Sequence, residues 1–322
     1  MKLLITGGAG FIGGHFVSYM INKYPFYHIV NLDKMTYAAN RELAEKFEKH
    51  PTYRFVKGDI ADPVIVDELF REGIDVVVHF AAESHVDRSI ADPSIFVRTN
   101  VLGTNVLLQA ATKYGVTKFV QISTDEVYGS LAKDDSPFSE ESPLAPNSPY
   151  ASSKAGADLL VRAYAKTYGL PVNITRCSNN YGPYQFPEKL IPLIIAHAYC
   201  NMSIPVYGDG LYIRDWLHVE DHCNAIDMVI HLGAVGEVYN IGGNNEKTNI
   251  EIVKQVLTEM KKPESLIRFV TDRPGHDRRY GIDATKLKSE LGWKPVYSIS
   301  SGLKTTIQWY LEHPDWWRGN IK

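Results

Sequence analysis

The sequence Gly7-Gly8-Ala9-Gly10-Phe11-Ile12-Gly13 decides the fold of this chain. It follows the short apolar run Leu3–Thr6, which predicts a buried strand, and its own apolar residues predict the start of a helix. Gly7, Gly10 and Gly13 have the spacing G-x-x-G-x-x-G. Glycine lets the backbone turn tightly and approach a phosphate, and a helix N-terminus adds free N–H groups and a positive dipole end. This strand–loop–helix unit therefore predicts a site for the pyrophosphate of a dinucleotide.

Asp33 indicates which dinucleotide is bound. It lies twenty residues after Gly13, at the end of the second predicted strand. A carboxylate at this position accepts hydrogen bonds from both ribose hydroxyls and repels a 2′-phosphate, which favours NAD over NADP. A glycine-rich loop on its own also closes ordinary turns, and an isolated Asp is often a turn or capping residue. The combination of loop, helix and Asp33 is what predicts NAD.

Predicted strands alternate with predicted helices through the first half of the chain. Short apolar runs rich in β-branched residues predict strands at Leu3–Thr6, His28–Leu32, Tyr53–Lys57, Val76–Phe80, Lys118–Ile122 and Val172–Arg176. The dipeptides Asp62-Pro63, Asp92-Pro93 and Ser148-Pro149 predict helix starts, because each offers a capping side chain followed by proline. The alternation predicts an α/β fold with a Rossmann-type, doubly wound parallel sheet.

Proline- and glycine-containing segments follow from about residue 177, where the alternation loosens. They predict a smaller, mixed α/β C-terminal lobe that binds the substrate. We expect an NAD-binding domain at residues 1–176 and a lobe mainly at 177–322. The segment Arg214–His231, an apolar strand and a helix, predicts that about 211–240 returns to the first domain.

Composition excludes several classes of protein. The 322 residues carry 34 basic and 37 acidic side chains, interspersed to a net charge of −3, which argues against nucleic acid as a partner. Three cysteines without C-x-x-C spacing predict neither a disulfide framework nor a zinc site, and they suit a reducing compartment. The cysteine spacing gives no reason to expect a bound metal. Because no apolar run approaches the length that spans a bilayer, we expect a cytoplasmic protein without a membrane partner.

Two short motifs predict the chemistry. In Tyr150-Ala151-Ser152-Ser153-Lys154, the i, i+4 spacing places the phenol and the ammonium on one helix face, where the cation should lower the pKa of the tyrosine. This spacing alone is also common on surface helices. Ser123-Thr124-Asp125-Glu126 ends the fifth predicted strand, at the sheet edge where the cofactor is expected. A hydroxyl, two carboxyl groups, a phenol and an ammonium are therefore expected in one crevice.

Taken together, Thr6–Gly13, Asp33 and Tyr150-x-x-x-Lys154 resemble the extended short-chain dehydrogenase/reductase family, and the match covers essentially the whole chain. Within it, Ser123–Gly129 resembles the dTDP-glucose 4,6-dehydratases, whereas the related epimerases usually lack the Asp-Glu pair. Further similar stretches are Ala81–Ser89, Arg176–Pro183, Glu188–Pro192 and Asp272–Asp277.

The resemblance implies a reaction and a role for each residue. Tyr150, assisted by Lys154 and Thr124, removes the 4-hydroxyl proton of dTDP-glucose while tightly bound NAD oxidises C4. Glu126 then takes the C5 proton, and a protonated Asp125 assists loss of the 6-hydroxyl as water. Hydride then returns to C6 and a proton returns to C5, which gives a 4-keto-6-deoxy sugar. Two neighbouring carboxyls repel when both are charged, so their pKa values should separate into one acid and one base.

Binding residues and a partner are also implied. The expected cofactor contacts are Gly7, Gly10, Phe11, Ile12, Gly13, Asp33, Lys34, Thr36, Asp59, Ile60, Ala81, Ala82, Ser84, Thr99, Tyr150, Lys154 and Asn180. The expected substrate contacts are Ser84, His85, Thr124, Asn179, Lys189, Leu190, Pro205, Tyr207, Arg214, Asn249, Arg273 and His276. The resemblance further implies a homodimer through helices near Ser94–Tyr114 and Tyr150–Tyr168. A 4-epimerase and a catalytically idle NAD-binding scaffold stay open as alternatives.

Overall fold

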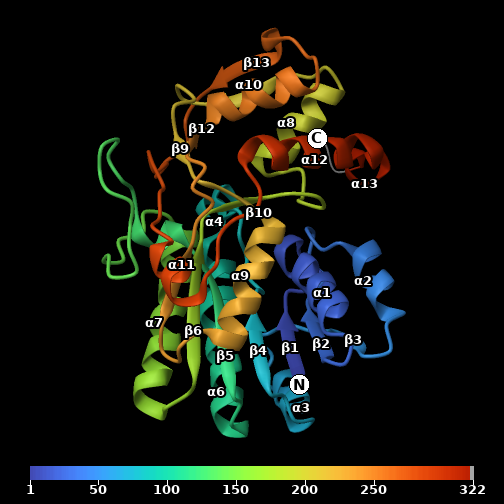
Figure 1. The fold of residues 1–322 in the computed structure, drawn as a ribbon, viewed down its shortest axis with the longest axis vertical. Coiled ribbons are helices and arrows are strands. Elements are labelled where there is room, and N and C mark those ends of the chain that lie inside the picture. Colours follow the sequence, from blue (N-terminus) through green and yellow to red (C-terminus); the bar gives the residue numbers. More distant parts are fainter. Residues whose placement is uncertain (320–322) are drawn as a thin grey trace.

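The computed structural model describes residues 1–319, and a seven-stranded parallel sheet lies at its centre (Figure 1). The strands of this sheet are β1 (Lys2–Thr6), β2 (His28–Asp33), β3 (Tyr53–Lys57), β4 (Val76–His79), β5 (Lys118–Thr124), β6 (Val172–Cys177) and β11 (Val238–Ile241). Their order is β11-β6-β5-β4-β1-β2-β3, with every pairing parallel. The order reverses between β1 and β4, and ligands bind at such a switch point in doubly wound sheets. The predicted fold class is confirmed.

All six predicted strands are present; β3 has the predicted ends, and each of the other five differs from its prediction by one or two residues at one end. β5 continues past Ile122 because Ser123 and Thr124 pair with Arg176 and Cys177 of β6. β4 ends at His79, one residue earlier than expected. The longer β5 carries Thr124 to the carboxyl edge of the sheet, directly before the two acidic residues.

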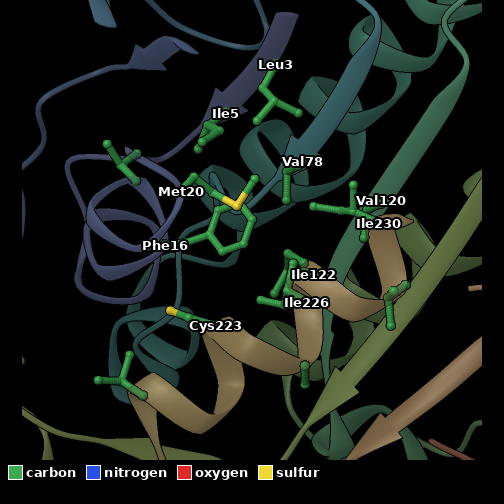
Figure 2. Packing of buried hydrophobic residues seen from close by; sticks show 14 of the residues in the cluster. Leu3, Ile5, Phe16, Met20, Val78, Val120, Ile122, Cys223, Ile226 and Ile230 are labelled. Atoms are coloured by element: carbon green, nitrogen blue, oxygen red, sulfur yellow. The ribbon is translucent and has the colours of Figure 1, made fainter. Parts of the chain in front are cut away.

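Helices cover both faces of the sheet. One face is covered by α1 (Phe11–Lys23), α2 (Arg41–Glu48), α9 (Val219–Leu232) and α11 (Thr285–Leu291). The other is covered by α3 (Pro63–Arg71), α6 (Thr104–Tyr114) and α7 (Pro149–Tyr168), with α4 (Val86–Ala91), α5 (Pro93–Phe96) and the π-helical segment η1 (Val97–Gly103) leading into α6. Figure 2 shows Phe16 and Met20 of α1 and Ile226 of α9 packed together beneath the strands. Burying each large apolar side chain stabilises the fold by about 1.5–3 kcal/mol.

The predicted helix starts are confirmed where they position the site. Ser148 caps α7 by accepting a hydrogen bond of 3.1 Å from the Ala151 N–H, with Pro149 at the first helical position. Asp62 caps α3 in the same way through the Val64 N–H at 2.9 Å. The cap at Ser148 places Tyr150 in the first turn of α7, next to the end of β5.

A smaller lobe lies beyond the carboxyl edge of the sheet (Figure 1). Its helices are α8 (Leu190–Tyr199), α10 (Asn249–Glu259), α12 (Ile299–Glu312) and α13 (Pro314–Arg318), which share a core that includes Tyr310 and Trp317. Three two-stranded sheets complete it: β7 (Asn179–Tyr181) with β10 (Trp216–His218), β9 (Ile213–Arg214) with β12 (Lys247–Thr248), and β8 (Ile204–Tyr207) with β13 (Ile267–Val270). Two short 3-10 helices, η2 (Asp125–Tyr128) and η3 (Glu264–Leu266), are also present.

The segment 211–240 returns to the large sheet differently from the expected strand and helix. Its helix α9 packs against α1 in the first core, but its strand β10 pairs with β7 outside the main sheet. The strand that joins the main sheet is β11, which pairs with β6 and is buried from Tyr239 onward. In residues 1–319, no helix is long and apolar enough to cross a membrane.

Candidate active site

A cavity of about 320 Å³ runs along the carboxyl edge of the sheet. Its wall combines the glycine loop, the ends of five strands and the segment before α8, and it includes every residue of the expected cofactor set. Of the expected substrate residues, Ser84, Thr124, Asn179 and Lys189 line it. The others lie outside this lining: His85, Leu190, Pro205, Tyr207, Arg214, Asn249, Arg273 and His276.

The glycine loop is too tightly packed to hold larger residues. Gly7 has a left-handed backbone with φ +75°, and a Cβ there would lie 2.6 Å from the Ala81 nitrogen. A Cβ on Gly13 would lie 2.3 Å from the Gly7 carbonyl oxygen. Gly10, as the N-cap residue of α1, contributes no capping side chain. The first N–H groups of α1 are therefore left for a ligand, and the loop fits a pyrophosphate.

The carboxylate of Asp33 is held in place by the backbone. Its Oδ2 accepts a hydrogen bond of 2.9 Å from the Ala9 N–H, and its Oδ1 accepts one of 2.7 Å from the Met35 N–H. Burial raises the pKa of Asp33, while these two bonds oppose the rise. Each carboxylate oxygen has a second lone pair, so Asp33 fits the ribose diol predicted from its position. Nearby, Lys34 Nζ lies 2.9 Å from Asp59 Oδ2.

Tyr150 and Lys154 lie in the same cavity, but the structure differs from the expected effect of the lysine on the tyrosine. Lys154 Nζ donates a hydrogen bond of 2.6 Å to the Ile122 carbonyl oxygen. Burial raises the pKa of Tyr150 well above its usual value, the Glu126 carboxylate raises it further, and a hydrogen bond with Thr124 opposes the rise. The expected lowering of the Tyr150 pKa was wrong for this structure, because burial raises this pKa by more than the neighbouring groups lower it.

Asp125 and Glu126 have different electrostatic surroundings. Asp125 is 2% exposed, and its pKa is raised well above the usual range by burial and then by the carboxylates of Glu126 and Asp215. Burial also raises the pKa of Glu126, but the cations Arg214, Lys189 and Arg273 oppose that rise. The charges around the two carboxyls therefore differ in the direction that the expected acid–base division requires. Burial and the neighbouring negative charges favour the protonated form of Asp125.

The three cations near Glu126 come from separate parts of the lobe. Lys189 Nζ donates to the Ser84 carbonyl oxygen at 2.8 Å. Arg214 is 5% exposed and donates to the Asp277 carbonyl oxygen at 2.9 Å. Arg273 lies 3.1 Å from the carboxylate of Asp87. Such a cluster of cations suits a diphosphate.

The remaining expected substrate residues surround this cluster. Within residues 1–319, four buried polar atoms of the expected substrate residues have no hydrogen-bond partner: His85 Nδ1, Asn179 Oδ1, Asn249 Oδ1 and Arg273 Nε. The Tyr207 hydroxyl lies 3.3 Å from Asp87 Oδ2, and Pro205 precedes it in β8. His276 stacks on Tyr212 at 3.7 Å. His85 precedes α4, and Leu190 begins α8.

Several residues of the wall were not predicted. They are Leu32, Ala38, Ala39, Phe80, Glu83, Ile122, Cys177, Ser178, Gln185, Phe186 and Glu188. Most lie at or just after the carboxyl end of a strand, a signal that could have found them. Gln185, Phe186 and Glu188 carry no such signal, since only the packing of the lobe brings them to the cavity. In residues 1–319, no group of three or more His, Cys, Asp or Glu side chains is arranged to hold a metal ion.

Comparison with known proteins agrees with the geometry. A family model described as GDP-mannose 4,6 dehydratase matches residues 4–306. A dTDP-glucose 4,6-dehydratase of Xanthomonas campestris pv. campestris (strain B100) is 52% identical over 335 residues, covering 98% of this chain and 95% of that protein. The chain belongs to the sugar-nucleotide 4,6-dehydratase family.

Solved structures of 4,6-dehydratases share the whole fold. The dTDP-glucose 4,6-dehydratase from Bacillus anthracis str. Ames, in complex with NAD, is 54% identical with a TM-score of 0.93, covering 99% of each chain. The one from Streptomyces venezuelae, with NAD and TYD bound, is 50% identical with a TM-score of 0.96, also covering 99% of each chain. The resemblance predicted from the sequence is confirmed.

Proposed function

We infer that this chain is an NAD-dependent hydro-lyase that converts dTDP-glucose into dTDP-4-keto-6-deoxy-glucose. The observation that carries this inference is the placement of Asp125 and Glu126 beside Tyr150 in the cavity that begins at the glycine loop. Oxidation at C4 and removal of water across C5 and C6 require these groups at one sugar ring. Relatives named for this reaction, about half identical over nearly the whole chain, support it.

The chain's own residues would hold NAD along the sheet edge. The N–H groups at the start of α1 bind the pyrophosphate, Asp33 accepts from the ribose hydroxyls, and Tyr150 and Lys154 lie toward the nicotinamide end. When bound, NAD supplies a hydride acceptor and donor at the sugar carbon, and its oxidised ring adds a positive charge. Because the hydride is returned within the same cycle, the cofactor is not consumed.

Tyr150 acts on the 4-hydroxyl group. Thr124 hydrogen bonds to its phenol and Lys154 lies one helical turn away. Burial raises the pKa of Tyr150, so the tyrosine would act as a base once the positive charge of bound, oxidised NAD and the Lys154 ammonium together stabilise its phenolate. The later proton transfers fall to the carboxyl pair. Glu126, surrounded by cations, removes the proton from C5, and Asp125, kept protonated by burial, gives its proton to the departing 6-hydroxyl.

The substrate diphosphate lies among Lys189, Arg214 and Arg273. Arginine meets phosphate oxygens in pairs, and buried cations next to an anionic ligand are stabilised by it. Four buried atoms without hydrogen-bond partners in the described chain, on His85, Asn179, Asn249 and Arg273, offer further polar contacts. Tyr207 and Pro205 offer an apolar surface for the base. We propose the remaining expected contacts, His85, Leu190 and His276, as the outer part of the same subsite.

Product analysis tests this function directly. The purified protein is incubated with the glucose derivatives of dTDP, UDP, GDP and CDP, and products are analysed by mass spectrometry. Loss of one water from dTDP-glucose is the expected result. In heavy water, deuterium should enter the product at C5, because Glu126 exchanges its proton with solvent. An unlabelled 4-epimer would show instead that the chain is an epimerase, and no product at all would favour an idle NAD-binding scaffold.

We also propose a homodimer through the helices near Ser94–Tyr114 and Tyr150–Tyr168. Large apolar side chains are exposed there: Val97 by 56%, Leu102 by 47% and Leu159 by 55%. Exposed apolar groups on adjacent helices are typical of subunit interfaces. Sedimentation should give about twice the chain mass of 36.2 kDa, and a single-chain mass at micromolar concentration would refute the dimer.

We also propose which lobe binds NAD, which lobe binds the substrate, and where the enzyme is located. Residues 1–176, rejoined by about 211–240, form the NAD-binding domain, and 177–322 mainly bind the substrate. The cavity supports this division, because its cofactor end lies on strands of the large sheet, whereas Lys189 and Arg273, two of the cations near Glu126, lie in the lobe. A cytoplasmic location fits the three unpaired cysteines of the described chain.

A further inference from the structure

Three ionisable side chains form a buried row on helix α7. Tyr150, Lys154 and Asp158 follow one another at intervals of four residues and are 9%, 4% and 1% exposed. This spacing places them on one face of the helix. The helix packs against β5 and β6. The row therefore extends the Tyr–Lys pair by a carboxyl group that the proposed reaction does not use.

Asp158 is anchored from the neighbouring strand. Its Oδ2 accepts a hydrogen bond of 3.0 Å from Arg176 Nε of β6, which is 5% exposed. Arg176 also donates to the Tyr128 hydroxyl at 2.9 Å, and this hydroxyl donates to Asn240 Oδ1 at 2.8 Å. The other carboxylate oxygen, Asp158 Oδ1, has no hydrogen-bond partner within residues 1–319. Burial raises the pKa of Asp158, and the nearby cations Arg176 and Lys154 oppose that rise and so favour the charged carboxylate.

Lys154 depends on a nearby negative charge. In the described part of the chain it has no ion pair, and its hydrogen bond goes to a neutral carbonyl oxygen. Burial lowers the pKa of Lys154, and Asp158 is the main group that opposes this fall. The Cys177 thiol on β6 acts in the same direction, while His79 on β4 is the other titratable neighbour. Burying an ammonium without a counter-charge is costly.

We propose that Asp158 is a positioning residue for the oxidation step, whose carboxylate, anchored by Arg176, keeps the Lys154 ammonium charged one turn from Tyr150. The proposal rests on the proposed function, in which Tyr150 is the base that acts on the 4-hydroxyl. Asp158 itself touches neither sugar nor cofactor in this scheme. It acts through Lys154 alone.

The sign of the effect follows from the charges. Without the carboxylate, Lys154 loses its proton at a lower pH, and a neutral amine no longer stabilises the Tyr150 phenolate. The rate of hydride transfer should therefore fall off at a lower pH in Asp158→Asn than in the unmodified protein. Because Asn has nearly the same size and shape, packing on α7 is retained.

The experiment measures the pH dependence of hydride transfer in a single turnover of the NAD-loaded protein, followed by the near-ultraviolet absorbance of the nicotinamide. In Asp158→Asn, the alkaline limb of the plot of hydride-transfer rate against pH should move to lower pH by about one pH unit or more. This is the size of pKa shift expected when a buried group loses a charge partner. The KM for dTDP-glucose and the NAD content should stay within about twofold of the unmodified values, since neither ligand contacts Asp158. An alkaline limb at its original pH, accompanied only by a lower melting temperature, would overturn the proposal and leave Asp158 a structural residue.

Two further variants keep the test decisive. Tyr128→Phe removes one partner of Arg176 but leaves the Asp158 carboxylate, so it should lower stability without moving the limb. Arg176→Met removes the cation that anchors the carboxylate and opposes the rise of the Asp158 pKa, so Asp158 gains a proton more easily and the alkaline limb should move to lower pH, as in Asp158→Asn. If Asp158→Asn does not fold, an unmoved limb in Arg176→Met overturns the proposal. Absence of hydride transfer in the unmodified protein would instead refute the proposed function.

Discussion

The Tyr37 hydroxyl donates a hydrogen bond of 2.8 Å to Glu188 Oε1 and thereby joins the loop after β2 to the segment before α8. Arg88 stacks on the Tyr37 ring at 3.6 Å and lies 3.5 Å from Glu188 Oε2. Glu188 and the residues on both sides of Tyr37 line the cavity. Three segments that are distant in sequence are thus tied together along the cofactor site.

Tyr37→Phe should accelerate the release of NAD. The substitution removes one hydrogen bond, worth about 1 kcal/mol or roughly fivefold in rate, and keeps the ring that Arg88 contacts. Release is measured by diluting the loaded protein and following free NAD with time. Tyr168→Phe, at the exposed end of α7, is the matched control and should leave the rate unchanged. Equal release rates in both variants would show that the Tyr37–Glu188 contact does not retain the cofactor.

Gly13→Ala should abolish NAD binding, because the new Cβ would lie 2.3 Å from the backbone oxygen of Gly7 and displace the loop. Gly156→Ala is the control, since its Cβ would meet only a Val101 methyl at 3.5 Å. Alanine in a helix interior is favoured over glycine by about 1 kcal/mol, so this control should be slightly more stable and fully loaded. The NAD content of both purified proteins gives the answer, and a loaded Gly13→Ala protein would contradict the role of the loop.

Glu126→Gln should retain NAD and substrate binding but lose at least about 10²-fold in turnover, the usual scale for a general base. Hydride transfer in a single turnover should survive, because the oxidation at C4 uses Tyr150 and not Glu126. Steady-state rates and a binding titration separate the two effects. Turnover within a few-fold of the unmodified enzyme would remove Glu126 from the mechanism.

Arg214→Met should move the acidic limb of the turnover profile to higher pH. A base works only above its pKa; burial raises the pKa of Glu126, and Arg214 is the strongest group that opposes the rise. Removing this cation lets the pKa rise further, so more alkaline conditions are needed to deprotonate Glu126. Arg268→Met, on an exposed residue of β13, is the control for loss of a positive charge. If the acidic limb lies at the same pH in Arg214→Met, Arg268→Met and the unmodified protein, a group other than Glu126 sets the position of this limb.

Phe16→Ala should destabilise the fold by about 3–5 kcal/mol, because the side chain is fully buried between α1, α9 and the sheet (Figure 2). Phe26 is 86% exposed, so Phe26→Ala should change the free energy of unfolding by less than about 0.5 kcal/mol. Chemical denaturation of both variants tests the pair. Similar costs at the two positions would contradict the packing described for this core.

Much of the fold and of the candidate site could be predicted from local patterns. The run Gly7–Gly13 follows one strand, and Asp33 ends the next. These signals predict the dinucleotide crevice because they are short and lie close together in the sequence. Thr124, Asp125 and Glu126 reach the same edge as Tyr150 because strands in a parallel sheet end on one side. Sequence alone therefore determined the fold class and the cofactor, and it predicted which two carboxyls would form the acid–base pair.

Only the tertiary structure decided which charges act on which groups. Lys189, Arg214 and Arg273 are up to 84 residues apart, yet all three lower the pKa of Glu126. Burial cannot be read from local spacing. It raises the pKa of Tyr150, which was expected to fall, and it lowers the pKa of Lys154, where Asp158 is the main group that opposes the fall. The choice of β11 over β10 as the seventh strand was likewise made by packing. A pKa depends on distance and dielectric in three dimensions, and these quantities exist only once distant segments have met.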